Sequence, residues 1–401
     1  MEMEKETKKI GLYWKILLVV AAVWGVFFAL SFIKSFDDWY VDHIFPAIQQ
    51  VVGRIFNVFP FAFGEILMYF CTLLVVVTVI LSLVFVIRWI VRKCRKKSGK
   101  RNTFYRVYMK SVLVVAVLFL WAYLFHWWIP YNGHVFGEKN QDRTRGFTAQ
   151  EYRYVRIQVG IKCMEAMKAI PRDADGRIIY PDKKTAYEVI ARNVKKLSDR
   201  YPRLKGYYSK PKAALCSDVL EWMYIGGYTY PYTMEITYNK YVDNLYWYTM
   251  IAHETAHYKG FYKENEGECM GILACILSDD PLMVYSGCAD YYFTVQSKYF
   301  NAMIEDYGLE EGMKRIKEEF AQDPDYTLDE QQIFLDQEDA ARVAQEAYEA
   351  DSHPLENYSD TAEEVADTGW ETQEVIAAEN YYDDGYRLIM EYFLKEREEG
   401  R

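Results

Sequence analysis

The chain has 401 residues, a formal net charge of −10 and hydrophobic and aromatic contents of 51% and 17%, which together exclude a disordered polypeptide. The absence of a net basic charge argues against a nucleic-acid partner. The charge is unevenly divided, because residues 1–130 carry 16 basic and 7 acidic side chains whereas residues 131–401 carry 31 basic and 50 acidic ones. Such asymmetry predicts two parts that occupy different environments.

Three long apolar runs lie in the first part, at about residues 12–33, 66–91 and 110–129. Each has about 20 residues or more, enough for a helix to cross a hydrocarbon core of about 30 Å. A buried core helix is the alternative for a single run, but three of them within 130 residues favour a membrane region. We therefore expect residues 1–130 to anchor the protein in a lipid bilayer as a multi-pass segment.

The loops between these runs predict the orientation. Residues 92–110 contain nine basic side chains and no acidic one, which is typical of a cytoplasmic loop that faces anionic lipid. Residues 34–65 are nearly neutral and should face the outside. The N-terminus is then cytoplasmic, and residues 131–401 lie on the outer side of a bacterial cell membrane.

The second part is predicted to be mainly α-helical. Thr148 and Glu151 form a capping-box pattern that opens a helix to about residue 170. Further helices are expected at about residues 183–199, 244–259, 264–278 and 282–307. The Tyr- and Thr-rich residues 228–238 favour a small edge strand or hairpin. Residues 309–401 form an acidic helical C-terminal extension, since residues 301–401 hold 30 acidic and 8 basic side chains.

The main chemical signal is an H-E-x-x-H pattern, in which His253 and His257 enclose Glu254. Residues i and i+4 of a helix lie on the same side, so two imidazoles one turn apart can bind one Zn²⁺ at about 2.0–2.1 Å. Glu254 lies next to that face and can act as general base toward a zinc-activated water. The alternative is a helix whose histidines only pack or form hydrogen bonds.

A catalytic zinc ion needs a third protein ligand and an open position. Gly260 lets the chain turn, so a helix that begins near Glu264 can return against the first one. Glu264 and Glu268 share one face of this helix, whereas Glu266 points elsewhere. A solvated acidic helix start, favoured by the helix dipole, is the alternative. Together with the histidine pair, the carboxylates favour a metal site.

The stretch HETAHYKGFYKENEGE at residues 253–268 resembles a bacterial family of membrane-anchored, gluzincin-like HExxH proteins of unknown function. That family has a pattern similar to H-E-x-A-H-x-x-G-F-x-x-E-x-E-A-N and N-terminal membrane helices. The resemblance extends to residues 227–235, 273–275 and 285–287 and fits the layout of about residues 1–300. The acidic tail matches it poorly.

The resemblance implies a mostly helical, zincin-like domain at residues 131–308. His253 and His257 would be zinc ligands, Glu254 the general base and Glu264 the third ligand.

Two departures concern Gly267, which stands where Ala is usual, and Glu268, which stands where Asn or Asp is usual. The second position orients a ligand histidine in gluzincins. Glu268 therefore either takes this orienting role or replaces Glu264 as the ligand.

The resemblance also implies a role for the predicted strand. Gluzincins bind a peptide substrate as an added strand beside an edge strand, which makes Tyr228, Tyr230 and Tyr232 candidates for the substrate strand. A purely structural hairpin is the alternative. Tyr285 is a candidate to stabilise the oxyanion of a tetrahedral intermediate.

The sequence thus predicts a membrane-anchored zinc metallopeptidase that cleaves a peptide or protein substrate outside the cytoplasmic membrane. The alternative is a non-catalytic, metal-stabilised membrane sensor or cell-envelope assembly protein. A third interpretation is an envelope interaction protein whose function depends on the acidic tail.

Overall fold

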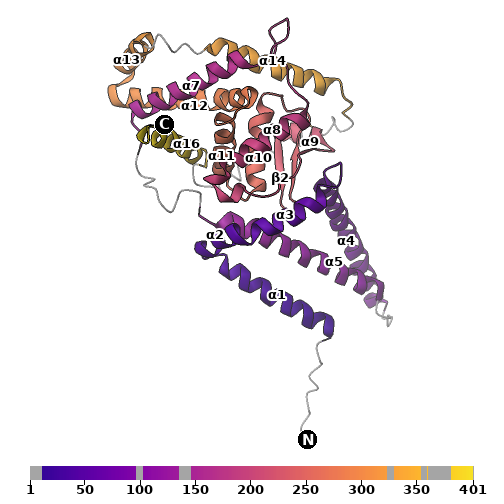
Figure 1. The fold of residues 1–401 in the computed structure, drawn as a ribbon. Coiled ribbons are helices and arrows are strands. Elements are labelled where there is room, and N and C mark those ends of the chain that lie inside the picture. Colours follow the sequence, from indigo (N-terminus) through magenta and orange to yellow (C-terminus); the bar gives the residue numbers. More distant parts are fainter. Residues whose placement is uncertain are drawn as a thin grey trace.

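The computed structural model describes residues 11–95, 103–134, 146–322, 329–353, 359 and 381–400. The chain forms a mainly helical domain above a set of diverging apolar helices that lead to the N-terminus (Figure 1). The elements of the first part are α1 (Leu12–Leu30), α2 (Lys34–His43), α3 (Phe45–Phe56), α4 (Phe63–Cys94), α5 (Thr103–Tyr123), the π-helix η1 (Leu124–Trp128) and α6 (Ile129–Asn132).

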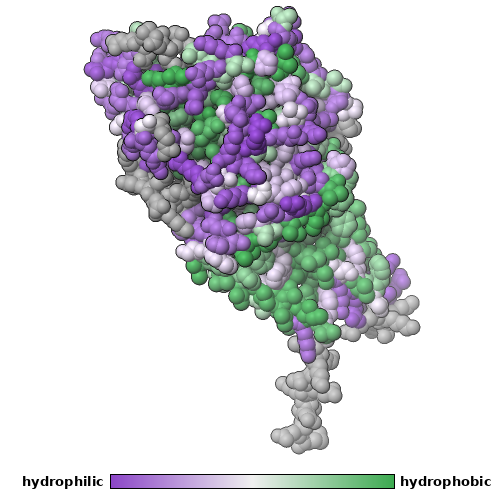
Figure 2. Space-filling model, viewed as in Figure 1, coloured by the Kyte–Doolittle hydropathy of each residue, from purple (hydrophilic) through white to green (hydrophobic). Residues whose placement is uncertain are grey.

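The three predicted membrane runs are confirmed as helices long and apolar enough to cross a membrane. They comprise α1, α4 and the continuous helical stretch Thr103–Asn132. Their apolar side chains point outward and almost none is buried inside the protein. Figure 2 shows the result as a hydrophobic zone below a largely hydrophilic domain. An outer surface of this kind is stable in lipid, where a helix satisfies its own backbone hydrogen bonds.

The third of these helices changes geometry where it reaches the domain. Pro130 has no backbone N–H, so the carbonyl oxygen of His126, four residues earlier, cannot accept the i→i+4 hydrogen bond of an α-helix. The helix is a π-helix at this point, and the hydroxyl of Tyr262 donates to the His126 carbonyl at 2.6 Å. The His126 carbonyl, near the end of this candidate spanning helix, thereby becomes an attachment point for the domain.

The domain begins with helices that the sequence predicted to within a few residues. Its elements are α7 (Ala149–Ala169), α8 (Lys183–Lys196), η2 (Leu197–Asp199), η3 (Pro202–Leu204), β1 (Lys212–Ala213), α9 (Ser217–Trp222), β2 (Gly227–Tyr230), β3 (Glu235–Tyr238), α10 (Tyr246–Tyr258), α11 (Glu264–Ile276) and α12 (Pro281–Tyr307). The capping box is confirmed, because Thr148 Oγ1 accepts from the Glu151 N–H at 3.2 Å and Glu151 Oε2 accepts from the Thr148 N–H at 2.9 Å.

The strands form a small sheet in the order β1-β3-β2, which places β2 at an edge. β2 and β3 are antiparallel and β1 runs parallel to β3. The N–H of Asn239 donates to the carbonyl of Gly226 at 2.8 Å, so Gly226 belongs to a hydrogen-bonded pair. Because such pairs alternate along an antiparallel ladder, the backbone groups of Gly227 and Thr229 point away from β3, toward the open edge.

Two buried carboxylates join the sheet to the start of α4. Glu235, on β3 and fully buried, accepts from the backbone N–H groups of Phe63 and Gly64 at 3.1 and 2.7 Å. It also pairs with Lys212 Nζ at 2.5 Å. Glu65 in turn accepts from two backbone N–H groups just before α9, at 2.6 and 2.7 Å. These bonds satisfy otherwise orphaned helix N-terminal donors and fix the domain on the apolar helices.

The described residues of the acidic C-terminal segment include the helices α13 (Leu309–Gln322), α14 (Glu330–Glu349) and α16 (Tyr381–Glu398). It is not detached from the preceding domain. Ile333 and Ile389 are fully buried in the same core as α10 and α11. Asp336 forms a two-pronged ion pair with Arg172, with both N···O distances 2.7 Å. The acidic side chains therefore cover the outside of helices whose inner faces complete the core.

Candidate metal centre

Helix α10 holds the two histidines of the H-E-x-x-H pattern one turn apart. The His253 and His257 rings lie with centroids 4.4 Å apart, and their side chains are 23% and 10% exposed. The predicted helix and its pattern of burial are thus present, with Ile251, Ala252 and Ala256 in the core. The buried flanks hold the histidine face at the wall of a cleft.

The end of α10 orients one of these histidines. Gly260 has a φ of +91°, a conformation that glycine adopts without strain, and it reverses the chain after the helix. The carbonyl of Phe261 then lies 2.6 Å from His257 Nδ1. A backbone carbonyl bonded to Nδ1 leaves Nε2 free to bind a cation, which is the usual arrangement around a metal-binding histidine.

Helix α11 brings Glu264 to the histidine pair. Glu264 Oε2 lies 3.2 Å from His253 Nε2 and 3.6 Å from His257 Nε2. Donor atoms of these three residues lie within 4.8 Å of one another, and they form the one such His/Cys/Asp/Glu group among the described residues. Ligands bound at 2.0–2.2 Å to a tetrahedral ion are separated by about 3.3–3.6 Å, and the two separations from Glu264 lie close to this range.

Gly267 allows the two helices to approach this closely. A Cβ atom at this position would lie 2.7 Å from His257 Cε1 and 3.1 Å from His253 Cε1, which is shorter than ordinary van der Waals contact. Gly271, one turn later, faces the backbone of His253 in the same way. The departure from Ala at position 267 therefore has a steric reason in this chain.

Glu254 lies beside the cluster and is 5% exposed. Its carboxylate Oε2 is 2.9 Å from the hydroxyl of Thr229 on the edge strand, and the same hydroxyl is 2.8 Å from the Glu254 carbonyl. Burial raises the pKa of Glu254, while the two histidines oppose the rise. A positioned carboxylate with a raised pKa suits proton transfer near neutral pH.

The ligand set is electrostatically coupled without an ion. Burial disfavours a charged His257, but the hydrogen bond and the charge of Glu264 overcome this and raise the His257 pKa to about 9. Burial likewise opposes the ionised form of Glu264, yet hydrogen bonds from His253 and His257 hold its pKa well below the usual range. A carboxylate with a lowered pKa beside a histidine with a raised pKa indicates that the cluster favours positive charge near Glu264.

A cleft of about 450 Å³ opens over the cluster. Helices α10, α11 and α12 form one side and the strand β2 with the residues before it forms the other. Trp127, from the π-helix that continues α5, completes the rim. The lining residues are Trp127, Tyr224, Ile225, Gly226, Gly227, Tyr228, Thr229, Tyr246, Thr249, Met250, His253, Glu254, His257, Glu264, Glu268, Ile272 and Asp290.

Glu268 lines this cleft but is not part of the three-residue group. Its Oε2 atom is buried and has no hydrogen-bond partner among the described residues. Burial, with the charge of Asp290 in addition, raises the pKa of Glu268 to about 7. The geometry therefore favours Glu264 over Glu268 as the third ligand, and the Phe261 carbonyl orients His257.

Only one of the three predicted strand tyrosines faces the cleft. Tyr228 lines it, whereas the ring of Tyr230 lies against Gly64 at the start of α4. Tyr232 lies beyond the strand, in the turn, and packs on Phe119 of α5 with ring centroids 5.0 Å apart. The latter two side chains contact the apolar helices instead.

The structure places Tyr285, the candidate for oxyanion stabilisation, away from the cleft. Tyr285 is fully buried and its hydroxyl donates to Asp336 Oδ2 at 2.7 Å. It therefore belongs to the network that holds α14 and does not line the cleft. Sequence reasoning also missed Thr229 and Trp127, since both come to the cleft from elements distant in sequence.

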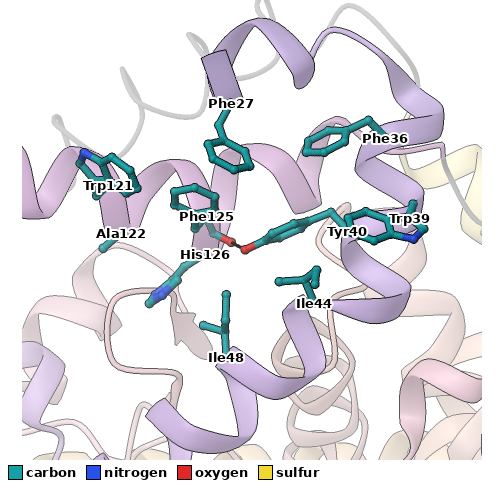
Figure 3. A pocket seen from close by; sticks show the side chains of 10 residues that line it. All are labelled: Phe27, Phe36, Trp39, Tyr40, Ile44, Ile48, Trp121, Ala122, Phe125 and His126. Carbon is teal, nitrogen blue, oxygen red and sulfur yellow. Dashed lines mark hydrogen bonds between the residues drawn. The ribbon is translucent and has the colours of Figure 1, made fainter. Parts of the chain in front are cut away.

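A second cavity, of about 650 Å³, lies among the apolar helices (Figure 3). Aromatic side chains from α1, α2 and the α5–η1 helix surround it. Tyr40 donates to the Phe125 carbonyl at 2.9 Å and His126 Nδ1 lies 2.9 Å from the Pro231 carbonyl, whereas the buried Trp121 Nε1 has no hydrogen-bond partner among the described residues. This cavity suits an apolar chain and offers no set of groups for catalysis.

Fold and site together define a protein in which three candidate membrane-spanning helices carry a mainly helical domain with a His–His–Glu cluster. The chain belongs to the family described as "Protein of unknown function (DUF3810)", which matches residues 40–350. The match thus includes α14, well beyond the limit of about 300 expected from the sequence. No curated protein and no solved structure matches the chain.

Proposed function

We propose that this protein is a membrane-anchored zinc metallopeptidase. The observation that carries the proposal is the convergence of His253 Nε2, His257 Nε2 and Glu264 Oε2 beside a buried Glu254. Three donor groups and a neighbouring carboxylate in an open cleft match what a hydrolytic zinc site requires.

The reaction is hydrolysis of a peptide bond. The C–N bond breaks, the water oxygen bonds to the carbonyl carbon, and the water proton passes to the leaving amine. A bound zinc ion supplies Lewis acidity and makes the attacking water more acidic. Glu254 takes the proton from water and delivers it to the amine, while Thr229 holds the carboxylate in place.

The free edge of β2 supports a peptide substrate. Gly227 and Thr229 direct backbone groups outward beside the cluster that have no partner in the part of the chain that the structure describes, and an extended peptide can pair with them. The basic loop at residues 92–110 supports a cytoplasmic position for that loop and, with it, an outer position of the cleft at a bacterial membrane.

A metal-stabilised sensor or assembly module is the second candidate, because the same ligand set could hold a structural ion. Metal analysis of the purified protein tests the site: we expect about one zinc per chain, lost in H253A and in E264Q and retained in the cleft control E268Q. Zinc retained in E264Q would refute the ligand assignment.

The variant E254Q then separates the two functions. It should keep its zinc and lose peptide hydrolysis by about a hundredfold or more. A zinc-loaded wild type and E254Q that cleave equally, or not at all, would favour the sensor or assembly module. Deletion of residues 309–401 cannot test the tail, since it also removes core residues such as Ile333 and Ile389.

A further inference from the structure

The cleft is held at a fixed position relative to the apolar helices. Glu235 and Glu65 bind the start of α4 to the sheet and to the segment before α9. On the other side, Tyr262 donates to the His126 carbonyl of the α5–η1 helix. Tyr262 directly follows Phe261, whose carbonyl contacts the ligand His257. Polar contacts on two sides of the site thus limit movement of the domain away from the apolar helices.

The rim of the cleft includes the end of a candidate spanning helix. Trp127 belongs to the helical stretch Thr103–Asn132 and lines the cleft together with the ligands. Its ring packs edge-on against Tyr262, with centroids 5.0 Å apart. Tryptophan at a helix end is typical of the membrane–water interface. A substrate in the cleft therefore lies next to the bilayer surface.

The edge strand leads toward the same surface. Its final residue, Tyr230, lies over Gly64 at the start of α4, and Tyr232 in the following turn packs on Phe119 of α5. Gly227, at the other end of β2, lies beside Glu254. An extended peptide paired with this strand rises about 3.3 Å per residue, so one of its ends is directed at the lipid within a few residues.

The segment between α1 and α4 adds an apolar surface at the base of the domain. Val51, Ile55 and Val58 are 59%, 55% and 80% exposed, although they belong to or follow an amphipathic helix. Helices of this type lie in the headgroup region with their apolar face in lipid. The base of the domain is thus suited to rest in the interface.

We infer that the substrate is the juxtamembrane segment of a membrane-anchored polypeptide, bound in extended form along β2 and cleaved just outside the bilayer. This inference rests on the proposed peptidase function and adds the substrate class. The same cleft could also accept a soluble peptide. Such a peptide would lack the high effective concentration that a substrate gains when it is anchored in the same bilayer as the enzyme.

The first test compares new N-termini in membranes of cells that express the wild type or E254Q. We expect wild-type-dependent termini within about ten residues of a membrane span, a reach of roughly 35 Å for an extended chain. Termini located mainly in soluble proteins or far from any span would overturn the inference and leave the peptidase intact. The absence of any Glu254-dependent terminus would overturn the peptidase and the inference with it.

The second test measures binding without turnover. In E254Q, Tyr224, which lines the cleft and is 71% exposed, is replaced by the photoreactive residue p-benzoylphenylalanine. Cross-linked peptides should map next to membrane spans of their parent proteins. Peptides from water-soluble regions would contradict the assignment.

A third test uses reporter substrates in nanodiscs that contain the zinc-loaded protein. One cleavage sequence found in cells is placed next to a membrane span, about thirty residues away from it, or on a soluble peptide. We expect cleavage of the first reporter to be about tenfold faster or more. Equal rates for all three would refute a juxtamembrane substrate.

Discussion

Replacing Glu235 by Ala should loosen the domain from the apolar helices. Three donors lose their acceptor: the backbone N–H groups of Phe63 and Gly64 and the ammonium of Lys212. Lys212 is 7% exposed and keeps only the carbonyl of Phe56, at 2.8 Å. Removing one partner of a buried ion pair costs about 3–5 kcal/mol, because the other charge stays buried without compensation.

This free energy predicts a measurable melting shift. For a folded unit of about 150–250 residues, 1 kcal/mol corresponds to about 2–4 °C, so E235A should melt about 6–20 °C below the wild type. Tryptophan fluorescence in nanodiscs reports the transition. The control K212M/E235Q removes both charges yet keeps an oxygen for the α4 donors, and it should lose less than half as much. A shift of E235A below about 2 °C, or a control as unstable as the single variant, would refute the reasoning.

Three further predictions concern the base, a buried amine and the tail. T229V keeps the side-chain shape but removes the hydroxyl bonded to Glu254, so the acidic limb of the pH–rate profile should move up by about one pH unit while the zinc content stays unchanged; an unmoved limb would contradict the positioning role. Burial lowers the pKa of Lys183 to about 8 from an ordinary 10.5, so between these values the unfolded chain binds a proton that the folded chain lacks. The free energy of unfolding of the wild type should therefore rise from pH 8 to 10.5. K183M is expected to melt at a higher temperature than the wild type, and this difference in melting temperature should become smaller over the same pH range. A difference that does not change with pH would contradict a buried amine. D336N should expose α14 to limited proteolysis, because burial opposes the ionised Asp336, whereas its hydrogen bonds, chiefly from Arg172, and the charge of Arg172 hold its pKa below the ordinary 3.8. The wild type should keep this protection above pH 3.8 and lose it as the pH falls through the lowered pKa, and equal proteolysis of both proteins at neutral pH would contradict the clamp.

Local patterns predicted much of the site. The i, i+4 spacing of His253 and His257 requires only a helix, and Gly260 ends that helix in a conformation that favours glycine. Glu264 follows at once on the next helix, so a short turn brings it back to the histidines. Each of these relations spans fewer than a dozen residues, and the chain itself enforces them.

The remaining features depend on packing between distant segments. Thr229 meets Glu254 only because β2 lies along α10, and Tyr285 turns to Asp336 only because α14 covers α12. The composition of the C-terminal segment suggested a solvated extension, since its acidic residues outnumber the buried ones such as Ile333. The net charge of a segment indicates the polarity of its exposed side chains, but it does not predict whether the opposite face of a helix is buried in a core.

Pro130 has a consequence for how the protein must be handled. The carbonyl that it leaves without an i→i+4 donor is bonded by Tyr262, the neighbour of the residue that orients His257. A shortened protein that lacks residues 1–130 would lose this acceptor, the α4 donors to Glu235 and the tryptophan rim of the cleft in one step. Filling of the proposed zinc site is therefore expected to follow insertion of the candidate spanning helices, and purification for metal analysis should keep the full chain in a lipid or detergent environment.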